Sequence, residues 1–122
     1  MNKAETLRRI CEFAKAYSAE RIKTPLQLFA ETGYQANRTA ITDEEIEKEI
    51  EKNPQLLSEW LAFTEDKRWT PSWGISKNKK EYVVFHVSTN GKVDQNFRFE
   101  SGASACALMV RKEMEGFVER ST

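Results

Sequence analysis

Few residues of this chain could do acid–base or nucleophilic chemistry, and its single histidine is the first to consider. His86 lies in the segment VVFHVSTNGKVDQNFRF (residues 83–99), whose apolar and polar side chains alternate as in a strand, and Asp94 follows in the same segment. An imidazole paired with a carboxylate activates a serine or cysteine only at hydrogen-bond distance. Ser88 is near in sequence, but no motif fixes it as a nucleophile.

The turn of this hairpin determines which face of the sheet His86 occupies. A two-residue turn at Asn90-Gly91 would pair Tyr82 with Phe99 and mix polar and apolar side chains on both faces. A three-residue loop over residues 89–91 instead places Gly91 where left-handed backbone is needed and separates the two kinds of side chain. A one-residue slip would move every side chain to the other face, so we predict the three-residue loop.

This register predicts one apolar and one polar face. The apolar face holds Val83, Phe85, Val87, Val93, Phe97 and Phe99, interrupted by Gln95. The polar face holds Tyr82, Val84, His86, Asp94, Asn96 and Arg98, with His86 opposite Asp94 and Tyr82 opposite Arg98. A helix over residues 101–119 is expected to cover the apolar face, which puts the sheet between Cys106 and His86. We therefore predict a surface histidine paired with an acid, in a protein that is not an enzyme.

The cysteines and carboxylates indicate neither a metal nor a cofactor. Cys11 and Cys106 lie far apart and match no metal or redox spacing, so we expect two reduced, buried thiols. No calcium-loop spacing occurs, and one histidine is a poor basis for a zinc site. The uncharged runs are shorter than the roughly 18 apolar residues of a membrane helix, and no apolar signal segment begins the chain. These features predict a cytoplasmic protein without a membrane segment.

The composition is that of one soluble domain. The chain has 122 residues, of which 39% are hydrophobic and 31% charged, and its 19 basic residues balance its 19 acidic ones. A protein that coats nucleic acid usually carries a positive excess, so nucleic-acid binding is disfavoured. We expect a single domain over residues 1–122.

The chain changes hydrophobic period near its middle. Residues 1–67 are predicted to be helical: a long helix over about 4–19, two helices capped by Thr24 and Thr42, and one over about 54–65. Residues 70–119 predict strands at PSWGIS, EYVVFHVS and KVDQNFRFE, then a helix capped by Ser101. The expected fold is α+β: N-terminal helices followed by a three-stranded antiparallel meander and a C-terminal helix packed on the sheet.

Three sets of residues are candidates for binding a partner. The first is the polar sheet face with Tyr82, His86 and Arg98, because tyrosine and arginine are enriched in interfaces. The second is formed by Trp60, Trp69 and Trp73, for which burial in the core is the alternative. The third is the acidic helix with Asp43, Glu44, Glu47 and Glu51, which either is a solvated surface or attracts a basic protein.

A nucleic-acid surface is the competing interpretation. Lys77, Lys79 and Lys80 cluster between the first two predicted strands. The order helix, three strands, helix is that of double-stranded RNA-binding domains, which need basic residues at the start of the last helix. Here that segment is SGASACALMV and has no charge, so duplex binding is not supported.

The segment SWGISKNKKEYVVFHVSTNGKVDQNFRFESGASACALMVRKEMEGF resembles the C-terminal half of small bacterial immunity proteins. These proteins neutralise the toxins of contact-dependent growth inhibition and related polymorphic toxin systems. The resemblance implies binding to a toxin domain, often a nuclease, with no catalysis and no cofactor. The expected function is thus a protein-binding inhibitor. The alternatives are a nucleic-acid-binding regulator that uses the lysine cluster and a small hydrolase that uses His86 and Asp94.

Overall fold

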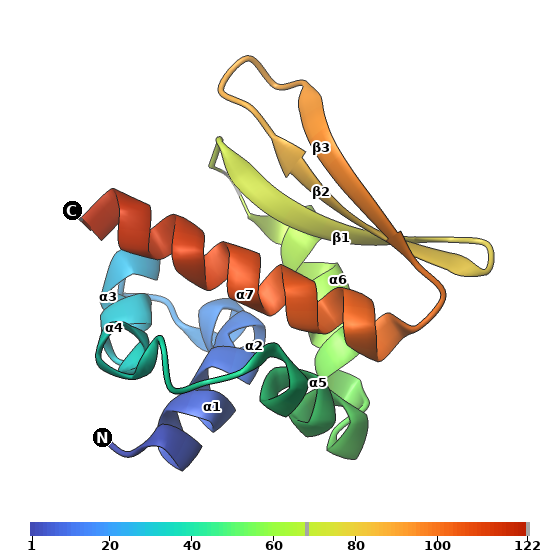
Figure 1. The fold of residues 1–122 in the computed structure, drawn as a ribbon. Coiled ribbons are helices and arrows are strands. Elements are labelled where there is room, and N and C mark those ends of the chain that lie inside the picture. The colour runs from blue at the N-terminus through green and yellow to red at the C-terminus, as the bar shows by residue number, and fades with distance from the viewer. Residues whose placement is uncertain (68, 122) are drawn as a thin grey trace.

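The computed structural model describes residues 1–67 and 69–121, which form helices, then three strands, then a long helix (Figure 1). The helices before the sheet are α1 (Lys3–Cys11), α2 (Phe13–Ala19), α3 (Pro25–Ala30), α4 (Tyr34–Asn37), α5 (Asp43–Lys52) and α6 (Gln55–Asp66). The strands are β1 (Ser72–Asn78), β2 (Glu81–Val87) and β3 (Val93–Phe99), and α7 (Gly102–Ser121) ends the fold. The α+β architecture predicted from the sequence is confirmed.

Local capping signals explain where two of the short helices begin. The Thr24 side chain accepts from the Gln27 backbone N–H while the Gln27 side chain accepts from the Thr24 N–H. Thr42 and Glu45 form the same reciprocal pair at the start of α5. Each box satisfies backbone donors that have no partner inside the helix, so both predicted starts are confirmed.

The first predicted helix is interrupted. Its continuous apolar stripe predicted one helix over residues 4–19, but the backbone leaves helical geometry at Glu12 and divides it into α1 and α2. The indole Nε1 of Trp60 donates to the Cys11 carbonyl oxygen at 2.9 Å beside this break. A contact from a residue so distant in sequence leaves no local signal. Gly33 has left-handed backbone (φ 76°), and the short α4 that follows it was not predicted.

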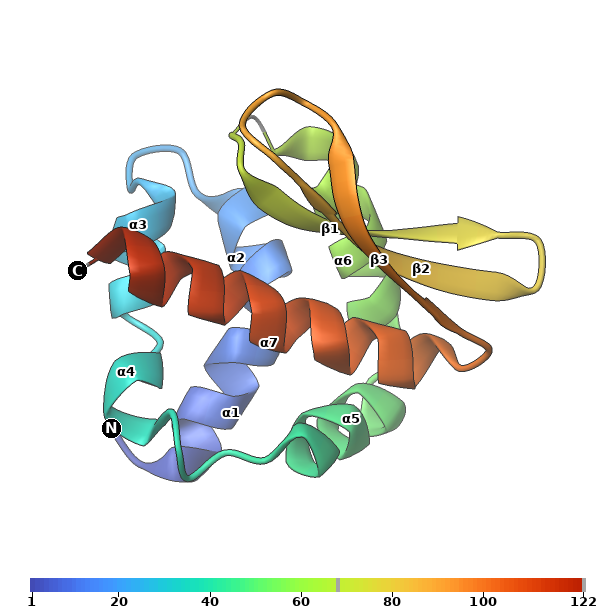
Figure 2. The same ribbon diagram turned by 45° about the horizontal axis from the view of Figure 1, so that its top comes forward.

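The long helix α7 lies between the N-terminal helices and the sheet (Figures 1 and 2). The strand order is β1-β2-β3, and the side chains of Ile75 and Val84 are buried. Gly102 at the start of α7 has no room for a side chain, because a Cβ there would lie 2.5 Å from Leu57 and 3.0 Å from Tyr82. Small residues at the beginning of α7 therefore allow the helix to approach the sheet closely.

The hairpin register differs from the prediction along most of its length. Gly91 is left-handed (φ 82°) and Val87 pairs with Val93, as the three-residue loop requires. A bulge between His86 and Val87 then shifts the pairing by one residue, so that Tyr82 pairs with Phe99. Beyond the bulge the strands therefore follow the register of the two-residue turn, which the sequence analysis had rejected. The reason is that an extra residue in one strand changes which residues face each other.

The predicted faces are reversed for β2, whereas Phe97 and Phe99 of β3 lie on the covered side and Asn96 and Arg98 on the other side, as predicted. Tyr82, Val84 and His86, predicted to lie on an uncovered face, share the face on which α7 packs, whereas Val83 and Phe85 point to the opposite side. We call this opposite side the open face. It consists of Val83, Phe85, Val87, Val93, Asn96 and Arg98. The predictions that Tyr82 faces Arg98 and that the sheet separates His86 from α7 are therefore wrong.

Candidate functional site

The open face carries apolar side chains that no helix buries completely. Val83, Phe85 and Val93 line a shallow hollow of about 290 Å³ together with Asn96 and Arg98. Val93 keeps 56% of its surface exposed, whereas Val84 on the covered face keeps 0%. The Phe85 ring lies over Gly74, where a Cβ would be 2.6 Å from the ring, so a glycine at this place lets the ring lie flat against β1.

The two edges of the sheet differ in whether another segment covers them. At the β1 edge, α6 packs against the strand, and the Thr64 hydroxyl oxygen accepts from the Ile75 backbone N–H at 3.0 Å. No described segment pairs with the outer edge of β3, and residues 93–98 are exposed. An edge strand of this kind presents unpaired backbone donors and acceptors to solvent. The open face therefore adjoins a backbone edge that can accept another strand.

His86 and Asp94 form the contact that the sequence predicted. Nδ1 of His86 lies 2.7 Å from Oδ1 of Asp94, and the imidazole packs 4.9 Å from the Trp73 ring. The Ser88 hydroxyl donates to the Lys92 carbonyl oxygen at 3.1 Å and also contacts the Asn90 side chain. These bonds close the hairpin turn. The nearest candidate nucleophile is thus engaged in holding the turn.

The two cysteines are buried as predicted. Burial raises the pKa of the Cys11 thiol to about 12, with Glu49 and Glu12 adding to the effect, and burial likewise raises the pKa of Cys106. A thiol must become a thiolate to act as a nucleophile or a metal ligand. At neutral pH both cysteines therefore remain protonated side chains of the core.

The three tryptophans have different environments. Trp60 is 0% exposed and belongs to the aromatic core with Phe13 and Phe63, so its prediction as a surface anchor is wrong. Trp69 and Trp73 are half-buried. Trp73 lies beneath the Lys112 ammonium at 5.1 Å and next to Phe97, on the covered side of the sheet. Only parts of these two side chains reach the surface.

The predicted acidic surface lies on α5. Asp43 forms a salt bridge with Arg111 at 2.9 Å, so this carboxylate ties α5 to α7. Glu44 and Glu51 are exposed and Glu47 is half-buried. The narrow apolar stripe of α5, Ile46 and Ile50, is buried almost completely. All four predicted acidic residues therefore keep accessible surface, and Asp43 also pairs with Arg111 within the chain.

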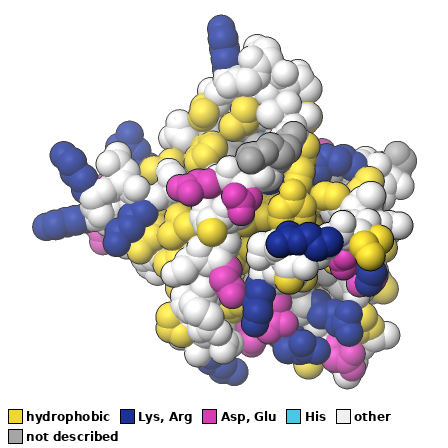
Figure 3. All heavy atoms as spheres, turned by 180° about the vertical axis from the view of Figure 1, so that it is seen from behind, with side chains coloured by type: hydrophobic (Ala, Val, Ile, Leu, Met, Phe, Trp, Pro, Cys, Tyr) yellow, Lys and Arg dark blue, Asp and Glu magenta, His cyan; other side chains and the backbone are white. Residues whose placement is uncertain are grey.

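The lysine cluster lies at the exposed turn between β1 and β2. Lys79 has a left-handed backbone (φ 57°), and the Lys77 ammonium lies 5.7 Å from the Tyr82 ring centre. Seen from behind, Lys and Arg side chains project from this hairpin and hydrophobic side chains lie between it and the helices (Figure 3). Arg98 on the open face is exposed, with Glu81 at 4.0 Å. The cations are thus distributed around an apolar region.

A buried ion pair escaped the sequence analysis. Lys67 donates to Glu113 at 3.1 Å, and the two side chains are 5% and 1% exposed. Burial lowers the pKa of Lys67 and raises that of Glu113, while the opposite charge of each partner offsets part of the shift. The pair joins the end of α6 to the middle of α7. A spacing of 46 residues gives no local signal for such a contact.

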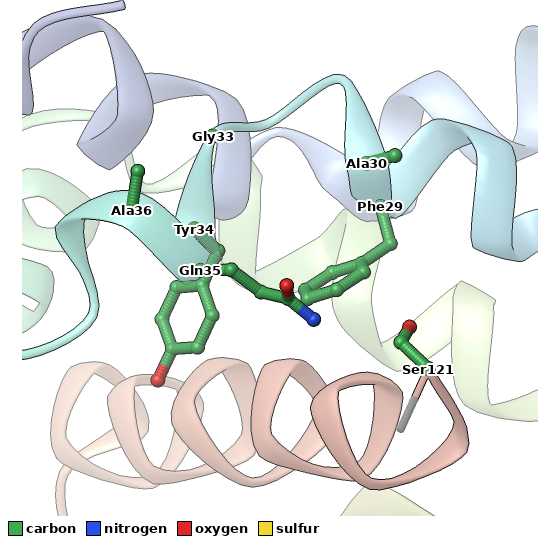
Figure 4. Close-up of a pocket in the computed structure, with 7 residues that line it drawn as sticks. All are labelled: Phe29, Ala30, Gly33, Tyr34, Gln35, Ala36 and Ser121. Atoms are coloured by element: carbon green, nitrogen blue, oxygen red, sulfur yellow. The ribbon is translucent and has the colours of Figure 1, made fainter.

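Tyr34 belongs to a second polar network that the sequence analysis missed. Its ring lines a hollow of about 360 Å³ between α3, α4 and the end of α7, and its hydroxyl points toward α7 (Figure 4). The hydroxyl donates to Glu115 at 2.5 Å and accepts from Arg111 at 2.8 Å. Burial and the bond to Glu115 raise the pKa of Tyr34 to about 12. The network holds α4 against α7.

Neither a metal site nor a membrane helix is found in the described part of the chain. No group of three or more His, Cys, Asp or Glu side chains is arranged to hold a metal ion among residues 1–67 and 69–121. None of the helices formed by these residues is both long and apolar enough to cross a bilayer. Comparisons with protein-family models, with curated proteins and with solved structures find no match.

Proposed function

We propose that this chain acts by binding another protein through the open face and the adjoining edge of β3. The observation that carries this proposal is the exposure of Val93 beside the half-buried Val83 and Phe85, on the face of the sheet opposite to α7. Arg98 and Asn96 border these apolar side chains. An apolar centre with a polar rim is the usual anatomy of a protein interface.

The resemblance of the C-terminal half to immunity proteins favours a toxin domain as the partner. An inhibitor of this kind would act by covering or distorting the toxin's active site, without a cofactor. The engagement of Ser88 in the turn and the burial of both thiols agree with a role that needs no nucleophile. The proposed function is therefore inhibition by binding.

The test is capture of a partner by the tagged protein and by surface variants. The prey should include lysate of the producing cells and the products of neighbouring genes. Val93→Lys places a charge in the open face, and we expect it to reduce capture of a stoichiometric partner strongly. Ile22→Lys is the matched control, since Ile22 is 91% exposed and lies outside the sheet.

A further variant separates the open face from the acidic helix. Glu47→Lys combined with Glu51→Lys reverses charge on α5 and should leave capture unchanged if the open face binds. Loss of capture by this variant alone would move the interface to α5. Equal capture by wild type and Val93→Lys would reject the open face.

Nucleic-acid binding through Lys77, Lys79 and Lys80 is the second candidate. The exposure of this turn and its projection from the helices support it (Figure 2). Replacing the three lysines with glutamine should then abolish salt-sensitive binding of RNA or DNA. Retention of RNA binding by the triple variant, or its absence from the wild type, would exclude this function for the turn.

A further inference from the structure

A separate hollow of about 410 Å³ lies where the start of α3 faces the end of α7. Its lining residues are Thr24, Pro25, Leu26, Trp69, Phe117 and Arg120. The Trp69 and Phe117 rings lie 6.1 Å apart, and Leu26 is 40% exposed at the α3 side. On the side seen in Figure 3, hydrophobic side chains reach the surface near the end of α6. The size and the apolar lining are typical of small-molecule sites.

Arg120 gives this hollow a positive charge. Its guanidinium lies 5.2 Å from the Phe117 ring centre and 5.8 Å from that of Trp69, and one NH2 group donates to the Pro71 carbonyl at 2.7 Å. That bond orients the side chain and leaves other N–H groups for a ligand. Among the described residues no carboxylate forms a salt bridge with Arg120. The nearby charges of Lys67 and Glu113 neutralise each other.

Trp69 contributes its ring to the hollow, while its N–H group is shielded from the hollow. The indole Nε1 of Trp69 is buried and has no hydrogen-bond acceptor within the described residues. By contrast, the Trp60 indole donates to a carbonyl oxygen. A buried N–H group without an acceptor is costly and is normally satisfied by protein, water or ligand. Because this N–H group has no accessible surface, a ligand in the hollow contacts the Trp69 ring and not its N–H group.

We propose that this hollow binds a carboxylate attached to an apolar body, as in an aromatic or medium-chain organic acid. The apolar body packs on the Trp69 and Phe117 rings, and the carboxylate accepts hydrogen bonds from the Arg120 guanidinium. Charge-assisted bonds to guanidinium favour the acid over a neutral analogue. The site lies outside the open face, so its occupancy is independent of the proposed protein binding.

The experiment is a titration of the ¹⁵N-labelled protein with 4-phenylbutyrate, followed by the indole N–H resonances in NMR spectra. Trp69→Phe identifies the Trp69 signal. We expect a saturable shift of that signal with the acid and a much smaller one with 4-phenylbutyramide. The amide has the same apolar body without the charge.

Two variants test the residues that define the site. Arg120→Met retains the apolar stem and should weaken 4-phenylbutyrate binding about tenfold, the effect expected of one lost charge-assisted bond. Arg98→Met is the matched control and should bind as the wild type does. Leu26→Trp should block entry, and because Leu26 is partly exposed this change is compatible with folding.

Three results would overturn the proposal. They are a Trp69 signal that does not move at millimolar acid, equal binding of acid and amide, or unchanged affinity in Arg120→Met. The tripeptide Gly-Gly-Phe, which has a free carboxyl group, is titrated in the same way as a final comparison. If it binds and 4-phenylbutyrate does not, the site recognises peptide ends and the small-acid assignment is rejected. Failure to capture a protein partner would change none of these titration results, because the hollow lies outside the open face.

Discussion

The two faces of the sheet differ although neighbouring residues of the same type form them. Val83 and Val84 are adjacent valines on β2, yet Val84 is fully buried beneath α7 while Val83 lies half-buried on the open face. What distinguishes them is the alternation of side chains along β2, which points the two valines to opposite faces, and not their own chemistry. The apolar content of a strand therefore does not decide which side is buried; the register and the position of the covering helix do.

The covered side of the sheet contains a buried ion pair, whereas the charged residue of the open face, Arg98, is exposed to solvent. The Lys67–Glu113 pair lies between α6, α7 and the start of β1, with Lys67 5.2 Å from the Phe63 ring. Two charges withdrawn from water depend on one another, since neither has solvent to stabilise it. The strongest test of the comparison therefore removes one of them.

Lys67→Met should have the largest effect on stability. It leaves the Glu113 carboxylate buried without its partner, and we expect a loss of about 3–5 kcal/mol in the free energy of unfolding. Chemical denaturation measures this. The double variant Lys67→Met/Glu113→Leu should recover most of the loss, because it removes both charges. If the single variant were as stable as the wild type, the pair would not be buried as described.

Valine-to-threonine substitutions at the neighbouring positions 83 and 84 compare the burial of the two faces directly. Val84→Thr places a hydroxyl in an apolar interior and should cost about 1–3 kcal/mol. Val83→Thr places it on the open face, where water reaches it, and should change stability by less than about 0.5 kcal/mol. Thermal unfolding of both variants provides the measurement. Equal losses would mean that the open face is also sealed.

Sequence reasoning succeeded where the signal is local. The capping residues Thr24 and Thr42, the left-handed Gly91 and the three strands all follow from neighbouring residues. It failed where distant contacts decide. The interruption near Cys11 is accompanied by a bond from Trp60, and after one bulge the β2 side chains lie on the faces opposite to those predicted.

In the candidate site, too, contacts between residues near in sequence were predicted and contacts between distant residues were missed. The contact between His86 and Asp94 was predicted because the two residues are close in the hairpin. The apolar side chains of the open face were predicted to be covered, so the surface proposed for partner binding was missed. Lys67 and Glu113 could not be paired from sequence, because their contact depends on how α6 and α7 pack.

Gly91→Ala tests the turn from which the register starts. A Cβ at this position meets nothing within 4 Å, so the cost comes from the left-handed backbone alone. We expect a loss of about 1 kcal/mol in unfolding free energy. Gly116→Ala is the control, because Gly116 also has open space but lies within α7. There alanine should stabilise by about 0.5–1 kcal/mol.

Val93→Lys should have the smallest effect on folding. Val93 is 56% exposed, so the charged group reaches water and stability should change by less than about 0.5 kcal/mol. We expect this substitution to reduce association with other molecules instead. A lysine interrupts the apolar part of the open face and disfavours strand pairing at the edge of β3. Denaturation curves together with light scattering at high concentration measure the two quantities. A large loss of stability without any change in association would show that this face is part of the core, and the distinction between the two faces would fail.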